Sequence, residues 1–303
     1  MTQPSPDPFP RIGFIGAGRL AATLSRGFVQ KGITVATVAS RTPASALRLA
    51  GAIPGCQAVE DPQRVVDAAD IVFISVTDRA IPEVAASLRW RTGVSAVHCS
   101  GATEVAALAP AAAMGAMTGG FHPMQTFADP EAALASLPGC TVTIEADEPL
   151  HSHLKALAAA LDCRSITLPA GARVLYHASG AYASQYAVAL LAEAAKLWAS
   201  FGVGEADAIA ALLPLLRGTA ASVEKAGLAY GMPGPVSRGD LDTVRRHLDA
   251  LDAFDAQAAL LYRQLALRTV TLAKTRGVLS EEQETRLNRW LGQAEPRNQP
   301  QKI

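Results

Sequence analysis

Two short segments carry side chains suited to proton transfer near neutral pH. One reads His98-Cys-Ser-Gly101 and the other reads Phe121-His-Pro-Met-Gln-Thr-Phe127. His122 is the best single candidate for a catalytic or substrate-binding group, because a histidine can accept and release a proton near neutral pH. Ser100 is expected to present its hydroxyl to the substrate. His98 either takes part in the chemistry or ends its strand with the ring hydrogen-bonded to the backbone.

A second group of polar residues lies in an apolar, Ala-rich helical pattern. His177, Ser184 and Gln185 are seven and eight residues apart, which places them on one helix face. A polar stripe on an apolar helix either satisfies itself in the core or lines a pocket, and we favour the pocket. Tyr176 and Tyr182 are expected to be packing residues.

A third candidate is a cation in a rigid loop. Arg238 lies within Gly234-Pro-Val-Ser-Arg-Gly-Asp240, where glycines flank the arginine closely. A guanidinium held there could bind a substrate carboxylate, because its fork of donors matches two oxygens. It could equally pair with Asp240 or with a neighbouring subunit.

A glycine-rich turn near the start of the chain predicts a dinucleotide site. The sequence Ile12-Gly-Phe-Ile-Gly-Ala-Gly-Arg-Leu-Ala21 places an apolar strand before the turn and a helical pattern after it. In a Gly-x-Gly-x-x-Ala turn the first glycine permits the tight bend, and the second lets the backbone approach a pyrophosphate at the helix N-terminus. The predicted cofactor-binding residues of this turn are Gly16, Ala17, Gly18, Arg19 and Leu20.

The end of the next predicted strand indicates which dinucleotide binds. NAD-binding domains carry an acidic residue there that binds the ribose hydroxyls. This chain has Ser40, Arg41 and Thr42 instead, and these side chains suit a 2′-phosphate, so we predict NADP(H). The alternative is that Arg41 is only a solvated loop charge. Val76 and Thr77, at a later strand end, are predicted to lie beside the nicotinamide ribose.

The elements that must position these residues follow from the pattern of apolar runs. Runs at 12–15, 34–39, 71–76, 95–98, 117–121, 141–144 and 165–168 alternate with helical stretches. This alternation predicts an α/β, Rossmann-like, doubly wound parallel sheet. From residue 169 onward no strand-like alternation follows, so an all-α domain is expected.

Helix boundaries are predicted from prolines, glycines and capping residues. We expect helices over 171–201, 205–226 with a kink or break at Pro214, and 250–276. Asp240 could cap the helix that follows it, and Ser280-Glu-Glu-Gln283 is a capping box. Asp147, followed by Pro149, is expected to cap the helix that runs through Leu161.

The predicted organisation has four parts. Residues 1–10 form a disordered lead-in, 11–168 the NADP-binding domain, 169–292 a helical substrate and dimerisation domain, and 293–303 a tail. A helix of about 30 residues is roughly 45 Å long and needs cover on several faces when it is this apolar. We therefore expect a homodimer formed through the helical domain, with a monomer built on a central helix as the alternative.

Composition narrows the class of protein. The 303 residues are 50% hydrophobic, and the 27 basic and 27 acidic residues balance, so nothing indicates a nucleic-acid or membrane partner. No signal peptide or uninterrupted apolar run of membrane-spanning length is apparent. The four cysteines are scattered, which fits a reducing cytoplasm better than a disulfide frame or a metal site.

The motifs together resemble a bacterial family described as Rossmann-like with a C-terminal domain of unknown function, DUF2520. The resemblance rests on Gly16–Ala21, His98–Gly101, 121–127, Tyr176-His177 and 234–240, and it extends from about Arg11 to Leu291. It implies an NADP-dependent oxidoreductase of the 6-phosphogluconate dehydrogenase-like superfamily, related to pyrroline-5-carboxylate reductase and prephenate dehydrogenase.

One departure limits what the resemblance implies. Hydroxyacid dehydrogenases of this superfamily have a catalytic lysine early in the first long helix of the second domain, whereas this chain has none there before Lys196. A histidine, a water or the substrate must then handle the proton. We expect hydride transfer to a small carboxylate-bearing C=O substrate, for example a 2-oxo acid such as 2-dehydropantoate. The alternatives are an imine reductase of pyrroline-5-carboxylate type and a non-catalytic NADP(H) sensor.

Overall fold

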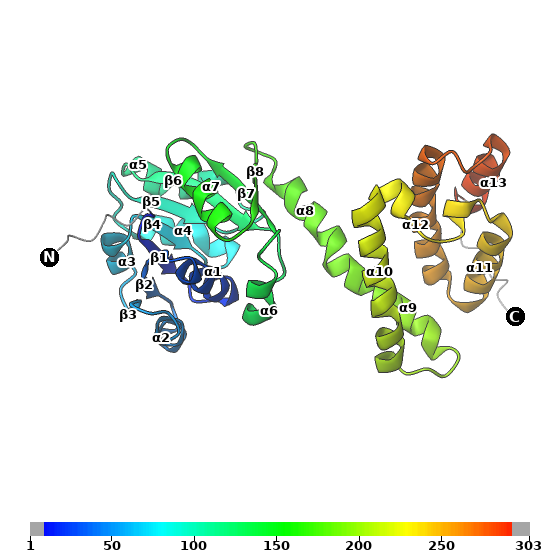
Figure 1. The fold of residues 1–303 in the computed structure, drawn as a ribbon, viewed down its shortest axis with the longest axis horizontal. Helices are drawn as coiled ribbons and strands as arrows, with labels where there is room; N and C mark the ends of the chain where they lie inside the picture. Colours follow the sequence, from blue (N-terminus) through cyan, green and yellow to red (C-terminus); the bar gives the residue numbers. More distant parts are fainter. Residues whose placement is uncertain (1–8, 293–303) are drawn as a thin grey trace, which may run out of the picture. The chain divides into compact units, whose positions relative to one another are not determined.

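An eight-stranded sheet organises the N-terminal part of the chain, of which a computed structural model describes residues 9–292 (Figure 1). The strand order is β3-β2-β1-β4-β5-β6-β7-β8. The strands are β1 (Ile12–Ile15), β2 (Val35–Ala39), β3 (Gln57–Val59), β4 (Ile71–Ile74), β5 (Ser95–His98), β6 (Met117–Pro123), β7 (Thr141–Ala146) and β8 (Arg164–Thr167). The tail predicted at 293–303 and residues 1–8 of the predicted lead-in lie outside the described residues.

The helices of this part follow the strands in the alternating order that the sequence predicts. They are α1 (Arg19–Gln30), α2 (Pro43–Gly51), α3 (Gln63–Ala68), α4 (Ile81–Ser87), α5 (Ala109–Ala113), α6 (Pro130–Ala135) and α7 (Leu150–Ala160), with 3₁₀ turns η1 (Asp78–Ala80) and η2 (Val105–Leu108). The Rossmann-like fold class is thereby confirmed. Strand β3 was not predicted, because it has three residues and no apolar run at the edge of the sheet.

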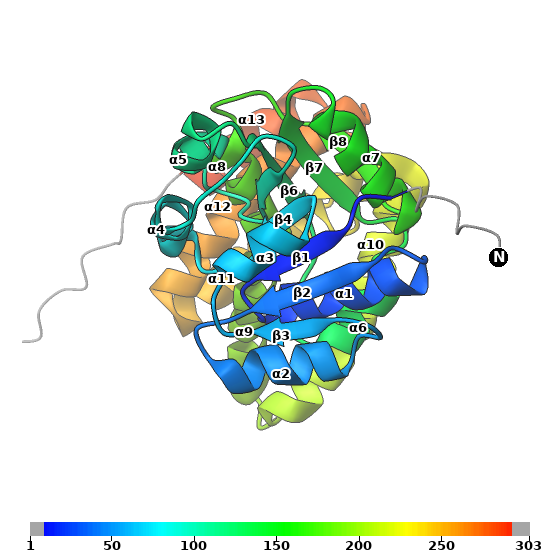
Figure 2. The same ribbon diagram turned by 90° about the vertical axis from the view of Figure 1, so that its left-hand side faces the viewer.

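Two apolar clusters bury the two faces of the sheet, with α4 and α5 on one side and α1 and α7 on the other (Figure 2). Ile12 and Phe14 belong to the cluster under α1, whereas Ile15 belongs to the cluster under α3 and α4. This alternation follows from the two-residue period of a strand. Burial on both faces explains why the strands read as continuous apolar runs.

The pairing of β7 corrects the predicted all-parallel sheet. Strands β1 to β6 pair in parallel, but β7 runs antiparallel to β6, with His122 opposite Thr143 and Gly120 opposite Glu145. The short helix between them, α6, packs against α1 instead of forming a full crossover over the sheet. The chain therefore returns from α6 in the reverse direction, and β8 then pairs in parallel with β7.

The helices after the sheet differ from the predicted ones at two breaks. The predicted helix over 171–201 consists of α8 (Arg173–Ala183) and α9 (Gln185–Ala199), because Ser184 leaves helical geometry at φ −116° and ψ −90°. The predicted helix over 250–276 begins late: α11 (Leu241–Phe254) and α12 (Ala256–Thr275) are separated at Asp255, whose carboxylate accepts the Gln257 N–H at 2.8 Å.

Helix α10 (Glu205–Gly231) runs through Pro214 as a helix, and its non-helical residue is Gly227 with φ +75°. The capping prediction is confirmed at Asp240, which accepts the Thr243 N–H at 3.0 Å. The capping box also forms at the start of α13 (Glu281–Gly292), where Ser280 and Gln283 exchange hydrogen bonds of 2.9 and 3.2 Å. Asp147 does not cap α7 with its side chain, because its backbone carbonyl receives the His151 N–H instead.

The chain divides into two compact units after Tyr186. In the second unit a small core joins the 3₁₀ turn η3 (Val236–Arg238) to α11, α12 and α13. Helices α9 and α10 have few buried residues, and apolar side chains such as Val188 and Leu215 are about two-thirds exposed. Among the described residues one helix, α10, is long and apolar enough to cross a membrane by length and composition.

Candidate functional site

The glycine turn has the geometry that a pyrophosphate site requires. Gly16 has φ +107°, and a Cβ there would lie 2.5 Å from the carbonyl oxygen of Ser75, so only glycine fits. At Gly18 a Cβ would meet nothing within 4 Å, which leaves the backbone open to a ligand. Gly18 precedes the first turn of α1, and no side chain caps that turn. Its amide groups and positive dipole end are therefore free of side-chain partners and suit an anion.

The segment after β2 is also arranged to hold a phosphate. Ser40 is half-buried, and its Oγ accepts the Thr42 N–H at 3.3 Å. Arg41 and Thr42 are exposed, and the Thr42 hydroxyl makes no cap hydrogen bond to α2. One guanidinium and two hydroxyls thus gather at the carboxyl end of β2, where an adenosine ribose binds in this fold.

The cofactor prediction at the end of β4 concerns Val76 and Thr77. Both follow Ser75, whose hydroxyl donates to the Gly16 carbonyl at 3.0 Å and so ties the β4 end to the glycine turn. Val76 is half-buried and Thr77 is exposed, and Thr77 precedes the 3₁₀ turn η1. Arg19, by contrast, donates to the Ala128 carbonyl at 3.1 Å, so part of its guanidinium is used inside the protein.

His122 lies at the centre of a cluster of rings. Its Nδ1 lies 2.7 Å from the Tyr176 hydroxyl oxygen, and its ring meets the Tyr176 and His177 rings edge-on at centroid distances of 5.5 and 6.1 Å. The two α8 residues come from one helix turn, and His122 comes from the last part of β6. Tyr176 is thus a hydrogen-bonding partner of His122, which corrects its prediction as a packing residue.

Gly101 permits this cluster to close. A Cβ on Gly101 would lie 2.5 Å from Cδ2 of His177 and 2.9 Å from Nε2 of His122, so any side chain would displace both rings. Residue 101 follows β5, and β5 pairs in parallel with β6. The carboxyl ends of these neighbouring strands therefore bring the His98–Gly101 segment and His122 to one edge of the sheet.

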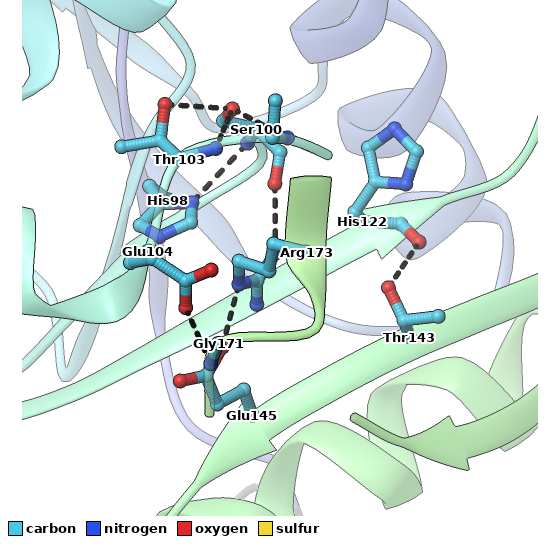
Figure 3. A network of polar contacts seen from close by, with 10 residues as sticks. His98, Ser100, Thr103, Glu104, His122, Thr143, Glu145, Gly171 and Arg173 are labelled. Carbon is cyan, nitrogen blue, oxygen red and sulfur yellow. Dashed lines mark hydrogen bonds and ion pairs between the residues drawn. The ribbon is translucent and has the colours of Figure 1, made fainter. Parts of the chain in front are cut away.

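A buried arginine links the same segments (Figure 3). Arg173 has no exposed side-chain surface; its Nε donates to Glu145 Oε2 at 2.6 Å and its Nη1 donates to the Ser100 carbonyl at 2.8 Å. A Cβ at Gly120 would overlap Nη2 of Arg173. The guanidinium therefore occupies the space that a side chain at residue 120 would take.

A cavity of about 300 Å³ adjoins this cluster. Its polar and ring-bearing lining residues are His122, Gln125, Thr126, His177, Ser184 and Gln185. The predicted stripe of His177, Ser184 and Gln185 thus lines one cavity together with His122, even though the helix breaks at Ser184. Another cavity, of about 330 Å³, lies beside the glycine turn and is lined by Gly18, Arg19 and residues of α1, α2 and α6.

Burial and neighbouring charges keep two histidines, His98 and His122, neutral. Burial, with His177 and Arg173, lowers the pKa of His122 from 6.5 to about 4, and Asp78 opposes this. Burial and Arg173 lower the pKa of His98 to about 3. Burial also raises the pKa of the Tyr176 phenol. At neutral pH His98 and His122 are therefore neutral imidazoles and Tyr176 is a neutral phenol, each able to donate one hydrogen bond.

Several predicted residues have structural partners. The Ser100 hydroxyl contacts Thr103 Oγ1 at 2.9 Å and accepts the Thr103 N–H at 2.9 Å, so it holds its own loop and does not line the cavity (Figure 3). His98 Nδ1 accepts the Ser100 N–H at 3.2 Å, which agrees with the interpretation that His98 ends its strand with the ring hydrogen-bonded to the backbone. The Ser184 hydroxyl donates to the Gly180 carbonyl at 2.7 Å. Arg238 belongs to the second unit and is exposed.

Sequence reasoning missed Arg173, Glu145 and Gly120. A signal was available at Gly119-Gly120, because glycine inside a strand often marks the close approach of another group. A second signal was a lone arginine at the start of an apolar helix. Neither signal indicates that Arg173 binds Glu145 beside Gly120, since it is the β6–β7 pairing that places Glu145 opposite Gly120. Among the described residues no group of three or more potential ligands could hold a metal ion.

The chain matches two family models. Residues 11–100 match the family described as NADP oxidoreductase coenzyme F420-dependent, and residues 140–269 match the domain of unknown function DUF2520. The two matches cover the glycine turn and the Arg173–His177 helix respectively. No curated protein matches the chain.

Solved structures share the fold along most of its length. A Bacteroides fragilis protein, provisionally described as an NADP oxidoreductase, is 26% identical with a TM-score of 0.68, covering 87% of this chain and 98% of that one. A reductive aminase from Aspergillus terreus, in complex with NADPH and ethyl-5-oxohexanoate, is 18% identical with a TM-score of 0.60, covering 94% and 93%. A 1-pyrroline-5-carboxylate reductase from Streptococcus pyogenes is 14% identical with a TM-score of 0.59, covering 92% and 98%.

The residues at the cofactor edge and the family matches agree. A glycine turn whose geometry suits an anion is followed by hydroxyl and guanidinium groups where a 2′-phosphate binds in this fold, and the N-terminal match is to an NADP oxidoreductase family. The C-terminal match begins at β7 and extends through α8, which carries Tyr176 and His177. The chain is therefore an NADP-dependent oxidoreductase in which a Rossmann-like domain precedes a region similar to DUF2520.

Proposed function

We propose that this oxidoreductase transfers a hydride from NADPH to the carbon of a C=O group in a small, carboxylate-bearing substrate. The best candidate is a 2-oxo acid such as 2-dehydropantoate. The observation that carries the proposal is that His122 lines a cavity at the carboxyl edge of the sheet while its Nδ1 lies 2.7 Å from the Tyr176 hydroxyl oxygen. Substrates in open α/β folds bind at this edge, beside the cofactor.

The proposal assigns the cofactor contacts by position. The backbone of Gly16, Ala17 and Gly18, continued by Arg19 and Leu20 in the first turn of α1, would bind the pyrophosphate. Ser40, Arg41 and Thr42 would bind the 2′-phosphate, and Val76 and Thr77 would lie along the nicotinamide ribose. The open space at Gly18 and the exposed Arg41 and Thr42 support these assignments.

The neutral His122 would supply the proton in this reaction. The cofactor provides the hydride, and the substrate oxygen gains negative charge as the carbon accepts it. With Tyr176 O–H donating to Nδ1, the Nε2–H of His122 can donate to that oxygen. The bond strengthens as charge develops, and the Nε2 proton then passes to the oxygen to give the alcohol. The Tyr176 proton passes to Nδ1 in the same step, so the ring stays neutral, and the phenolate regains a proton from water. His177 lies at the edge of the same ring and is the alternative donor.

Substrate orientation would come from the rest of the cavity wall. Gln185 offers an amide to a carboxylate, whereas the Ser184 hydroxyl is already bonded to Gly180. Arg238, in the second unit, stays a prediction from the sequence as a carboxylate-binding residue. Orientation of the reacting carbon against the hydride donor accounts for a large part of the rate in such enzymes.

An imine substrate of pyrroline-5-carboxylate type is the second candidate. One observation favours it: among the described residues that line the cavity there is no arginine or lysine. With its imine nitrogen protonated, such a substrate carries no net charge and would need no cation in that wall. The same His122–Tyr176 pair would then donate its proton to nitrogen instead of oxygen.

NADPH consumption in a panel of 2-oxo acids and cyclic imines tests the proposal. We expect saturable turnover of a 2-oxo acid, reduced about 10²- to 10⁴-fold by His122→Ala because proton transfer is lost. Exposed Arg64 on α3, with Arg64→Ala, is the matched control. Turnover of imines alone would select the second candidate. Tight NADPH binding with no consumption in the whole panel would contradict both and favour a sensor.

We also propose that the chain is a homodimer in the cytoplasm. The largely exposed apolar side chains of α9 and α10, including Val188 and Leu215, form a surface that a second copy would cover. All four cysteines are free, as expected in a reducing compartment. Light scattering should report a dimer for the native chain and a smaller species for Leu215→Glu. A native monomer would contradict this part of the proposal.

A further inference from the structure

Arg173 is an unusual residue for the inside of a protein. Its side chain has no exposed surface, and Nη2 has no hydrogen-bond partner among the described residues. A buried ion pair is often no more stabilising than apolar side chains of the same size, because both charges lose their hydration. A buried arginine therefore calls for an explanation other than stability.

The sheet leaves a space that the Arg173 side chain fills. Gly120 pairs with Glu145 and His122 pairs with Thr143 across β6 and β7. Residues two apart on a strand share a face, so these four positions form one patch in which Gly120 is the vacant place. The guanidinium fills that place and binds the carboxylate beside it.

The position of the Arg173 side chain fixes the positions of the two α8 residues that contact His122. Arg173, Tyr176 and His177 are spaced i, i+3 and i+4, so they lie on one face of the first turns of α8. When the guanidinium occupies the Gly120 position, the Tyr176 hydroxyl lies 2.7 Å from Nδ1 of His122. The His177 ring then meets the His122 ring edge-on.

The same guanidinium also holds the other side of the cluster. Nη1 donates to the Ser100 carbonyl at 2.8 Å (Figure 3). The next residue, Gly101, lies against the rings of His122 and His177. One side chain thus connects the end of β5, the β6–β7 pair and the start of α8. These are the three segments that surround His122.

We infer that Arg173 is a positioning residue for the reaction, which holds Tyr176, His177 and the Gly101 backbone in register around His122. The inference rests on the proposed function, in which His122 donates the proton. Arg173 itself has no place among the cavity-lining residues and acts through the three segments that it binds.

The charge of Arg173 supports the same role. The titratable and charged groups around His122 are Tyr176 and His177 of α8, Arg173, His98 of β5, Glu145 of β7 and Asp78 of η1. Arg173 is among the causes that lower the pKa of His122, after burial and His177. Its removal should move that pKa upward while burial continues to hold it below 6.5.

Two substitutions separate geometry from charge. Arg173→Ala removes both, whereas Arg173→Lys keeps a charge but lacks the fork that reaches Glu145 and Ser100 together. We expect kcat with the best substrate of the panel to fall about 100-fold in both, as expected for misplaced catalytic groups. The KM for NADPH should change little. Added guanidinium ion should restore part of the kcat of Arg173→Ala, which a general loss of packing would not allow.

Nuclear magnetic resonance of ring-labelled histidine measures the pKa and hydrogen bonding of His122 without any need for turnover. In Arg173→Ala the His122 pKa should rise and its Nδ1 hydrogen bond to Tyr176 should weaken. Lys31→Gln, which breaks the exposed Lys31–Asp162 pair, is the matched control and should change neither reading. Arg173 variants that stay folded with native kcat and an unshifted His122 resonance would overturn the inference.

The two proposals fail in different ways. If no panel compound is turned over but Arg173→Ala still alters His122, the reductase proposal fails and the positioning role stands. If Arg173→Ala does not fold, Arg173→Lys and Gly120→Ala still report on kcat and on the hydrogen bond between His122 and Tyr176. An unaltered His122 resonance in folded Gly120→Ala, where the guanidinium must move, would count against the inference.

Discussion

The cofactor edge and the His122 cluster are built in opposite ways. The cofactor edge uses backbone and exposed side chains that lie next to one another in sequence, in Gly16–Leu20 and Ser40–Thr42. The His122 cluster uses buried side chains that come from β5, β6, β7 and α8. The first region can therefore change without affecting the core, whereas in the second region function and folding share the same contacts.

The largest effect should come from Gly120→Ala, which tests this coupling most severely. The added methyl group overlaps the Arg173 guanidinium and would separate a buried ion pair. Breaking such a pair costs about 3–5 kcal/mol. Chemical denaturation should show this loss of unfolding free energy. Gly51→Ala is the control, since a Cβ there meets nothing within 4 Å and the change should stay within about 1 kcal/mol. Equal unfolding free energies of the two variants would contradict the claim that folding depends on the contacts of the His122 cluster.

A smaller effect, confined to binding, is expected at the cofactor edge. Arg41→Ala removes an exposed guanidinium that we assign to the 2′-phosphate, a contact of about 1.5–3 kcal/mol. The KM for NADPH should rise roughly 10- to 150-fold, while NADH kinetics and unfolding free energy stay unchanged. Steady-state kinetics with both cofactors provides the measurement. If NADH is affected equally, Arg41 does not recognise the additional phosphate.

Acid should weaken the His122 region before it weakens the cofactor edge. The folded-state pKa values of His98 and His122, about 3 and about 4, lie below the unfolded value of about 6.5, so the unfolded chain binds more protons. The stability contribution is complete above pH 6.5 and is lost as the pH falls toward 4. The slope should reach up to about 1.4 kcal/mol per pH unit for each histidine. Denaturation between pH 7 and pH 5, repeated with His122→Asn, should show a shallower slope in the variant. An equal slope would contradict the assignment.

The smallest effect should be that of Ser100→Ala, which separates the sequence-based role of this residue from its observed one. The hydroxyl holds Thr103 and the Ala102 N–H, so its loss should cost about 1 kcal/mol of stability. The kcat should change by less than about twofold, because losing this loop bond barely moves the cavity wall. A loss of kcat as large as that of His122→Ala would restore the catalytic role that the sequence suggested.

The elements that the sequence predicted well are those with a strong local pattern. The apolar runs of β1, β2, β4 and β5 and the capping box at Ser280 depend on neighbouring residues only. Strand β3 escaped prediction because its residues are half-exposed. The break at Ser184 was missed because no proline or glycine marks it, and the serine bonds back to Gly180 in a way that a helix also allows.

The candidate site was predicted as a set of residues but not as an arrangement. His122, His177 and Gln185 were chosen for their chemistry, and they line one cavity. The role of Tyr176 was misjudged because an aromatic residue on an apolar helix gives no sign of its hydrogen bond. Arg173 and Glu145 could not be paired by spacing, because the reversal of β7 that brings them together is not apparent in the local pattern.

By itself the sequence determined the glycine turn after β1, the Rossmann-like class and NADP as the cofactor, since each of these follows from patterns that can be read along the chain. The tertiary structure alone decided which groups surround His122. Its partner Tyr176 is 54 residues away in the sequence, and the register of β6 on β7 sets which side chains share its face. A register is a property of two paired segments, so neither segment encodes it alone.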